Sequence, residues 1–521
     1  MSRPCAISSG ATSGRNRAAE SRRKRINPCR FFGFVERPPH VKFPRMTTRP
    51  LLYPLPETAL NSQRWAAALR PAGGLIFFDS ALSHETLGRY SFIMADPFHR
   101  LVADDNDVRL DGVAVSGNPF SALADLMARY PQETVPDLPP FQGGVAGTFG
   151  YGLRHHVERV PHHRRDDQDI PDLLLGAYDL VVAIDHVAGK GWLISSGLPA
   201  QGAERQARAE ARIAWALDLH ARANVAPAGS NWAIAARPEL SGADYKAMVR
   251  KTIDYIEAGD IYQANITQRF RARLHAGIDR LDLYRALRRR NPATFAAFVE
   301  FDDVAILSSS PERFLALRDG QVETRPIKGT RPRGRNSLED QALAAELLAS
   351  EKDRAENLMI VDLLRNDISR VCRMGSVKVP VLWGLESYAT VHHLVSVVTG
   401  EMVPGKNAVD LLRATFPGGS VTGAPKIRAM EIIAELEPTS RGPYCGAIGY
   451  LGFDGSLDSN IVIRTYCIKG DDLSFQVGGG IVADSDPALE LEESLTKGKA
   501  LIETLASGGG QIRSDFGGSA A

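Results

Sequence analysis

The chain has few of the features that mark disulfide-rich, zinc-binding or membrane proteins. It has 521 residues but only five cysteines, which form no CxxC pair and follow no regular spacing, so neither a disulfide framework nor a zinc site is expected. The longest apolar stretch, Leu173 to Ile184, is interrupted by polar residues and is shorter than the roughly 20 residues that span a bilayer. The net charge of +1 gives no sign of a polyanionic partner. We therefore expect a soluble, cytoplasmic protein that binds neither membranes nor nucleic acid.

Composition divides the chain into four regions. The first is rich in Arg and Ser, contains the run Arg22-Arg-Lys-Arg25 and lacks periodicity. It fits a transit peptide, a nucleic-acid-binding arm, or translation from a start upstream of Met46; we favour the last and expect disorder. The next two are an N-terminal region of short strands and a larger region that carries the candidate chemistry, followed by a tail expected to be disordered. The boundaries are 1–46, 47–225, 240–506 and 507–521, with a linker-like break at 226–231.

Hydrophobic periodicity predicts a mixture of helices and strands. Predicted helices cover 119–130, 203–222, 245–258, 281–290, 338–372, 407–414, 425–436 and 487–506. Predicted strands cover 74–78, 90–94, 108–115, 144–150, 261–270, 295–309, 446–452, 459–467 and 473–478. In the second half, this alternation taken alone is typical of a parallel α/β fold.

Lys328 is the most informative residue of the sequence. It lies where the extended stretch Val322–Ile327 is expected to break into a Gly-rich turn, a place where a side chain can point into a cleft. An amine in such a place can act as a nucleophile. The alternative is an ordinary surface lysine in a loop.

Two predicted helices carry acidic residues with helical spacing. On the first, Ser350 and Asp353 form a plausible N-cap and N3 pair, and Asp353 shares a face with Glu356. The second begins near Pro487, and one of its faces carries Glu490, Glu493 and Lys497. Solvated charge pairs explain the same spacing.

Two glycine-rich segments complete the set of unusual local sequences. Phe416 to Lys426 runs into a helix, so its free N–H groups favour an anion, but Ala424-Pro425 replaces the Lys-Ser/Thr of a nucleotide-binding loop. Gln476-Val-Gly-Gly-Gly480 is expected to form a second turn of this kind, or only a tight bend. Taken alone, Glu312 is expected to pair with Arg313 or a neighbour, and a buried, hydrogen-bonded structural role is the alternative for His393.

The segment Pro326-Ile-Lys-Gly-Thr-Arg331 resembles the Pro-Ile-x-Gly-Thr-Arg motif of the chorismate-utilising enzymes. Further motifs follow in family order from about Tyr245 to Ala506, and more weakly back to Leu51. The resemblance implies an α+β fold of two large, mainly antiparallel sheets packed face to face with helices outside, built from both halves of the sequence. We follow it in preference to the parallel α/β interpretation.

The resemblance also implies the roles of individual residues. It assigns Mg²⁺ binding to Glu356 and Glu493, general acid/base catalysis to Glu312, and an active-site position to His393. The expected chorismate-binding residues are Gly329, Thr330, Thr422, Tyr444, Arg464, Gly478, Gly479, Gly480 and Lys497. A tryptophan pocket in related proteins corresponds to Ser80, Thr294 and Phe295. Thr294 replaces a proline of that pocket, so we expect a structural tryptophan or none, and no feedback control.

Position 328 separates the activities of the family. It is alanine in members that make anthranilate and lysine in members that make 4-amino-4-deoxychorismate, so Lys328 implies amination of chorismate at C4, on the route to p-aminobenzoate and folate. Gln263 stands where isochorismate and salicylate synthases carry the lysine that activates water, and glutamine cannot be that base. The alternatives are the anthranilate-forming component and a chorismate or tryptophan sensor.

In this mechanism neutral Lys328 attacks C2, and ammonia then displaces it from C4. We expect the pKa of Lys328 to be lowered by burial, by Mg²⁺ and by Arg325 or Arg331. Ammonia should come from a separate glutaminase subunit, since no cysteine lies in a Gly-x-Cys-x-Gly elbow.

Overall fold

The computed structural model describes residues 49–82, 87–223, 232–388 and 391–507. The predictions for 1–46, for the break at 226–231 and for the tail from 508 lie outside these ranges. Every pairing between the described strands is antiparallel, in two 12-stranded sheets, so the parallel α/β interpretation does not apply and the α+β prediction is confirmed. No helix in the described ranges is long and apolar enough to cross a bilayer.

The first sheet interleaves both sequence halves, because β2 of the N-terminal region pairs with β13. Its strand order is β1 (Leu51–Pro54), β10 (Lys190–Ser195), β9 (Leu180–Asp185), β3 (Tyr90–Met94), β2 (Leu75–Asp79), β13 (Phe295–Phe301), β14 (Val304–Ser310), β23 (Thr465–Lys469), β24 (Asp472–Ile481), β12 (Gln263–Arg273) and β11 (Arg237–Pro238), with β20 (Gly423–Ala424) on β12.

The second sheet is interleaved in the same way through the pair β7 and β21. Its strand order is β17 (Ile327–Pro332), β19 (Val391–Glu401), β16 (Gln321–Thr324), β15 (Arg313–Arg318), β22 (Leu457–Ile461), β21 (Ala447–Gly452), β7 (Gly144–Phe149), β8 (Leu173–Tyr178), β4 (His99–Asp104), β5 (Asp107–Leu110) and β6 (Val113–Ala114), with β18 (Lys378–Ser387) on β19.

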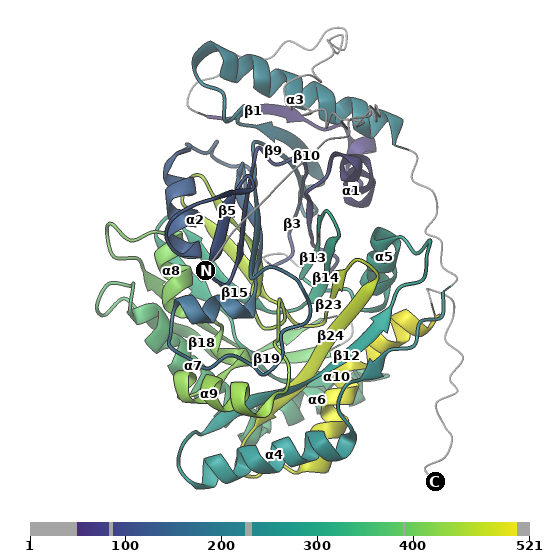
Figure 1. Cartoon of the computed structure of the whole chain (residues 1–521), viewed down its shortest axis with the longest axis vertical. Helices are drawn as coiled ribbons and strands as arrows, with labels where there is room; N and C mark the ends of the chain where they lie inside the picture. Colours follow the sequence, from purple (N-terminus) through teal and green to yellow (C-terminus); the bar gives the residue numbers. More distant parts are fainter. Residues whose placement is uncertain (1–48, 83–86, 224–231, 389–390, 508–521) are drawn as a thin grey trace, which may run out of the picture.

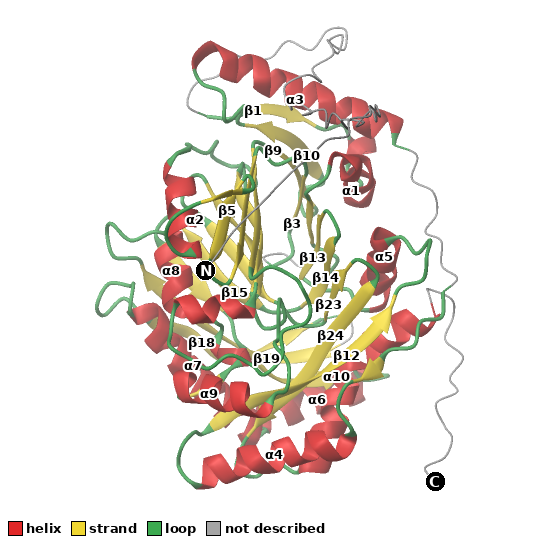
Figure 2. Ribbon diagram, viewed as in Figure 1, coloured by secondary structure: helices red, strands yellow, loops and turns green. Residues whose placement is uncertain are grey.

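The sheets pack face to face with helices outside them (Figures 1 and 2). Both faces of strand β8 are apolar, so the sheet is covered on both sides. Leu173 and Leu175 join the core beneath the outer helices, whereas Leu174 and Tyr178 join the core between the sheets. The helices are α1 (Ser62–Leu69), α2 (Pro119–Ala128), α3 (Gly202–Arg222), α4 (Gly242–Glu257), α5 (Arg280–Arg290), α6 (Ser337–Ala349), α7 (Glu351–Ser369), α8 (Ala408–Thr415), α9 (Lys426–Leu436) and α10 (Pro487–Ser507), with short 3₁₀ turns at Glu57–Ala59, Arg70–Ala72, Tyr151–His156 and Gly419–Val421.

Four predicted elements are each divided in two: two strands by a hairpin turn, one strand by a crossing from the second sheet to the first, and one helix by a cap residue. The strands predicted at 108–115, 295–309 and 459–467 turn at Asp111, Asp302 and Arg464, all with φ near +50°. The helix predicted at 338–372 is interrupted at Ser350, which ends α6 and caps α7 by accepting a hydrogen bond from the Asp353 N–H at 3.2 Å. These single turns do not disturb the apolar pattern on which the predictions rested.

Two predicted turns are strands instead. Gly478 to Gly480 lie inside β24, where they pair with Asn265 to Thr267 of β12. Lys328 lies in β17, where the register against β19 shifts between Ile327 and Thr330. The positive φ of Gly329, +93°, forms this bulge and turns the strand locally.

Candidate active site

Five of the predicted site residues, Glu312, Lys328, Glu356, Glu493 and Lys497, come together where α7 and α10 pack on the two sheets. Helix α7 packs on β17 and β19 of the second sheet, and α10 packs on β24 of the first. Gly329 permits the close approach of α7, because a Cβ at this position would lie 2.9 Å from the Leu347 side chain and 3.0 Å from Asp353. The residue after Lys328 therefore has to be glycine for β17 and α7 to meet.

Lys328 is half-buried, and its pKa is lowered from the ordinary lysine value. Burial is the main cause, and the Lys497 ammonium adds to it, while Glu356, Glu312 and Glu493 act in the opposite direction. These five residues therefore share one electrostatic environment, although they come from separate parts of the chain.

The predicted electrostatic partners of Lys328 are engaged elsewhere. The Arg325 guanidinium pairs with Glu386, and Arg331 pairs with Glu346 at 2.8 Å and with Asp353 at 3.1 Å. Charge-assisted hydrogen bonds between arginine and carboxylate are among the strong ones in proteins. The contribution expected from these arginines is thus supplied by Lys497.

Glu312 lies in the connection by which the chain passes from β14 in one sheet to β15 in the other, and only 6% of it is exposed. Burial raises its pKa to about 7, although the Ser420 hydroxyl and Lys328 act to lower it. Arg313 pairs instead with Asp458 and Glu323, both at 2.9 Å. The expected Glu312–Arg313 ion pair is therefore absent, and about half of the Glu312 carboxyls carry a proton near neutral pH.

Carboxylates from α10 lie directly over β24. A Cβ on Gly479 would lie 3.1 Å from Glu490 Oε2, 3.6 Å from Lys497 Nζ and 3.8 Å from Glu493 Oε1. Lys497 donates to Glu493 Oε1 at 2.7 Å and to the Gly478 carbonyl at 3.1 Å. The Glu493–Lys497 pair therefore reaches β24 through the Gly478 carbonyl, while the Glu493 and Lys497 side chains stay 52% and 37% exposed.

Glu356 of α7 is the carboxylate on the opposite wall. Burial raises its pKa, Lys328 lowers it, and Glu493 is close enough to raise it. Partial desolvation alone would raise the pKa of Glu493, but Lys497 outweighs it, so this carboxylate stays ionised. Among the residues that the structure describes, no cluster of three or more Asp, Glu, His or Cys is placed to hold a metal. Two carboxylates without softer ligands fit Mg²⁺, which keeps several waters and substrate oxygens as ligands.

A second group of predicted residues surrounds Arg464. Arg464, His393 and Thr330 line one cavity of about 70 Å³. Burial and the nearby Arg464 lower the pKa of His393 to about 4, so the imidazole is neutral, and its Nδ1 lies 2.9 Å from Thr330 Oγ1.

Burial lowers the pKa of Arg464, with Tyr444 acting against it, and no carboxylate of the described ranges pairs with this guanidinium. An arginine left in this state is available to an anionic ligand.

The glycine loop, residues 416–426, contacts the group of residues around Lys328 through Ser420. Its Thr422 is fully buried and donates its hydroxyl to the Gly418 carbonyl at 3.0 Å. Ser420, which was not predicted, contributes the hydroxyl that hydrogen-bonds Glu312. The sequence did offer one sign that Ser420 is a candidate site residue, namely its position two residues before Thr422 in a glycine-rich loop.

The residues assigned to a tryptophan pocket form a separate cavity. Ser80, Thr294 and Phe295 line it together with Arg313 and Tyr450, from both sheets. Thr294 also lines the cavity of Arg464 and His393. The loop containing Thr294 is thus a shared wall, and the absence of feedback control stays a prediction.

The fold and the family match together define the class of this protein, the enzymes that act on chorismate. The model of the chorismate binding enzyme family matches residues 76–503, and the chain belongs to this family.

Its relatives include aminodeoxychorismate synthase component 1 of Klebsiella aerogenes, 41% identical over 86% of this chain and 95% of that protein. Anthranilate synthase component 1 of Pseudomonas aeruginosa is 42% identical over 84% of this chain and 91% of that protein.

Solved structures give the same fold. Anthranilate synthase component I of Streptococcus pneumoniae superimposes with a TM-score of 0.71 at 32% identity, over 81% of this chain and 93% of that one. The menaquinone-specific isochorismate synthase of Escherichia coli superimposes with a TM-score of 0.67 at 18% identity, over 88% and 94%. Relatives of both amination types are equally close, so overall similarity does not assign the product.

Proposed function

We propose that this chain aminates chorismate at C4 to give 4-amino-4-deoxychorismate, a precursor of p-aminobenzoate and folate. The observation that carries the proposal is the amine of Lys328, which lies among Glu312, Glu356, Glu493 and Lys497 with a lowered pKa. An alanine at this position would leave space for ammonia to approach C2, and a lysine fills that space.

Glu312 and Lys328 act in turn on the ring. Protonated Glu312 gives its proton to the C4 hydroxyl, which leaves as water while the neutral Lys328 amine forms a bond to C2 and the ring double bonds shift. The new secondary ammonium returns a proton to Glu312. Ammonia then bonds to C4, the double bonds shift back, and Lys328 leaves C2 as it takes the proton from Glu312. The new C4 ammonium gives one proton back to Glu312. The net change is replacement of hydroxyl by amine, with loss of water.

Glu356 and Glu493 would hold Mg²⁺. When it is bound, this cation places positive charge next to a carboxylate of the substrate. Arg464, Tyr444 and the N–H groups of the glycine loop are the donors for the other carboxylate. Lys497 stays with Glu493 and the Gly478 carbonyl, and its charge adds to burial in lowering the pKa of Lys328.

Ammonia comes from a separate glutaminase in this proposal. Glutamine hydrolysis needs a reactive thiolate, but burial raises the pKa of Cys372 to about 11 and those of Cys445 and Cys467 to about 12. The relatives named above are each called component 1, which agrees with a second component that supplies ammonia.

The second candidate is anthranilate formation, which the Pseudomonas aeruginosa relative favours. The two are separated by incubating the protein with chorismate, Mg²⁺ and ammonium and identifying the product by mass spectrometry and fluorescence. 4-Amino-4-deoxychorismate supports the proposal. Fluorescent anthranilate, with strong inhibition by micromolar tryptophan, would replace it, and binding of chorismate without turnover would indicate a sensor.

A further inference from the structure

Three successive carbonyls of the glycine loop are bound from the same side. The Ser420 carbonyl accepts from Asn265 Nδ2 at 3.2 Å, and the Val421 carbonyl from Arg441 Nη1 at 2.9 Å. The Thr422 carbonyl accepts from the Asn265 N–H at 2.7 Å. All three oxygens are therefore turned towards β12 and Arg441.

This arrangement fixes where the following N–H groups point. The three peptide bonds are trans, and in a trans peptide the N–H points opposite to the carbonyl. The N–H groups of Val421, Thr422 and Gly423 are thus directed away from Arg441. Those of Val421 and Thr422 make only long bonds within the 3₁₀ turn, at 3.4 and 3.3 Å. Successive N–H groups directed to one side form an anion-binding concavity.

Arg441 is rigidly held in this position. It is fully buried, and it donates from Nε and Nη2 to the Glu437 carboxylate at 2.9 and 2.7 Å, and from Nη2 to the Asn265 carbonyl at 2.7 Å. Glu437 also accepts from the N–H and hydroxyl of Thr267, each at 2.9 Å. Each of the three guanidinium nitrogens has a protein acceptor, and four of the five N–H groups of Arg441 are bound within the protein.

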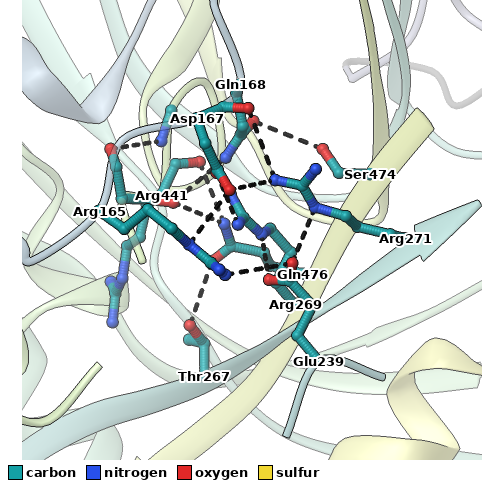
Figure 3. Close-up of polar contacts among 12 residues, drawn as sticks. Arg165, Asp167, Gln168, Glu239, Thr267, Arg269, Arg271, Arg441, Ser474 and Gln476 are labelled. Atoms are coloured by element: carbon teal, nitrogen blue, oxygen red, sulfur yellow. Dashed lines mark hydrogen bonds and ion pairs between the residues drawn. The ribbon is translucent and has the colours of Figure 1, made fainter. Parts of the chain in front are cut away.

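Residues from the N-terminal half of the chain contact Arg441 and its neighbours. The Tyr151 ring centroid lies 4.9 Å from the Arg441 guanidinium carbon, and the Tyr151 N–H donates to the Gly442 carbonyl at 2.8 Å. Gln168 Nε2 donates to the Ser440 carbonyl at 3.1 Å. Figure 3 draws Arg441, Gln168, Thr267 and Gln476 in one polar network. The Arg441–Glu437 pair at the centre of this network resists displacement, because separating the two groups would leave a buried charge unpaired.

We propose that Arg441 and Asn265 are positioning residues that orient the peptide N–H groups of the glycine loop towards a carboxylate of the bound substrate. The inference rests on the proposed function in one respect, namely that the site takes a dicarboxylate. Donors oriented in advance cost no reorganisation when the anion binds, so their loss appears as weaker substrate binding.

Arg441→Lys tests the proposal, because lysine keeps the charge next to Glu437 but cannot donate to all the acceptors of a guanidinium. The matched control is Arg212→Lys in the N-terminal half, where a guanidinium 6% exposed pairs with the fully buried Asp179 at 3.1 Å. Initial rates of chorismate consumption are measured with ammonium and Mg²⁺, together with melting temperature. We expect both variants to lose thermal stability, and only Arg441→Lys to raise KM for chorismate, by about tenfold or more, with kcat within about threefold and KM for ammonium unchanged.

Asn265→Asp is the second variant. If Arg441→Lys does not fold, the KM of Asn265→Asp for chorismate tests the proposal in its place. It keeps the size of the side chain but places an anionic acceptor against the Ser420 and Thr422 carbonyls. An unchanged KM for chorismate in a folded Arg441→Lys or Asn265→Asp protein, or an equal rise in Arg212→Lys, would overturn the inference. Chorismate consumption is independent of the product, so an unexpected product overturns only the proposed function. A wild-type protein that consumes no chorismate overturns both.

Discussion

Glu312 and Lys328 each bias the protonation of the other: the Lys328 ammonium lowers the pKa of Glu312, and the Glu312 carboxylate raises that of Lys328. Burial opposes both effects and is the larger influence on each group. Glu312 ends with a pKa of about 7, and Lys328 ends below the ordinary lysine value. Both groups are shifted towards their neutral forms, and these are the forms that an acid and a nucleophile need.

Glu312→Gln should stabilise the protein at high pH while it removes activity. The folded pKa of about 7 exceeds the ordinary 4.5, so the folded state binds more protons and stability falls as pH rises from 4.5 through 7. At pH 8 the variant should gain about 1–3 kcal/mol in free energy of unfolding, and at pH 4 almost nothing. Turnover should fall by about 10²-fold or more.

Urea unfolding at both pH values measures this difference. Glu492→Gln, an exposed change on α10, is the control and should show no such pH dependence. Equal stability of Glu312→Gln and wild type at pH 8 would contradict the raised pKa.

Lys328→Ala and Lys328→Arg should fail in different ways. Alanine opens the approach to C2, so residual turnover should shift towards 2-amino products or slower direct amination at C4. Arginine stays protonated and cannot attack, so Lys328→Arg should lose turnover without a change of product. Chromatography of the products with mass detection distinguishes the two, and 4-amino-4-deoxychorismate formed at the wild-type rate by either variant contradicts a nucleophilic lysine.

Removing a carboxylate from either helix should weaken the response to Mg²⁺. Glu356→Gln and Glu493→Gln each take away one charged oxygen ligand. The Mg²⁺ concentration for half-maximal activity should rise by more than the roughly 10–100-fold that changes outside the ligand set cost. Glu492→Gln serves again as the control on the exposed side of α10. Full activity of the wild-type protein in excess chelator would disprove a metal requirement.

Gly329→Ala should cost more than the same change at another glycine of similar conformation. Both Gly329 and Gly405 have positive φ, +93° and +87°, but only Gly329 would bring a Cβ within 3.0 Å of its neighbours, on α6 and α7. Gly405→Ala should cost about 1–2 kcal/mol from backbone strain alone and leave KM unchanged. Gly329→Ala should cost more and reduce kcat, because α7 carries Glu356. Similar losses in the two variants would show that the close approach of α7 is unimportant.

The sequence predicted most elements, but not the turns that divide them. Strands β3 and β7 and helices α2, α3, α9 and α10 were found within about two residues, because their apolar spacing is unambiguous. Arg464 adopts positive φ directly after the apolar run Ile461 to Ile463, and a single residue in that conformation leaves no mark on periodicity. Asp302-Asp303 is a polar turn signal that a prediction from periodicity alone passes over. The two-sheet topology came from resemblance alone, since alternation of helices and strands does not determine which strands pair.

The candidate site residues that lie in sequence motifs could be predicted, but their environments could not. Glu312 illustrates what could not be predicted: its raised pKa follows from burial between two sheets, and burial depends on contacts between segments far apart in the chain. For the same reason Lys497 was not anticipated as the cation that acts on Lys328, and Arg325 was wrongly expected. The role proposed for Arg441 depends on three carbonyl orientations, which no sequence pattern encodes.

The most direct test of the account is the intact mass of the protein after incubation with chorismate and Mg²⁺ in the absence of ammonia. The account predicts that the wild-type protein gains the mass of chorismate minus one water, that Lys328→Ala gains nothing, and that added ammonium removes the adduct as product appears. A wild-type protein that never gains this mass, under conditions where ammonium gives turnover, would contradict covalent catalysis and leave Lys328 as a steric guard of C2.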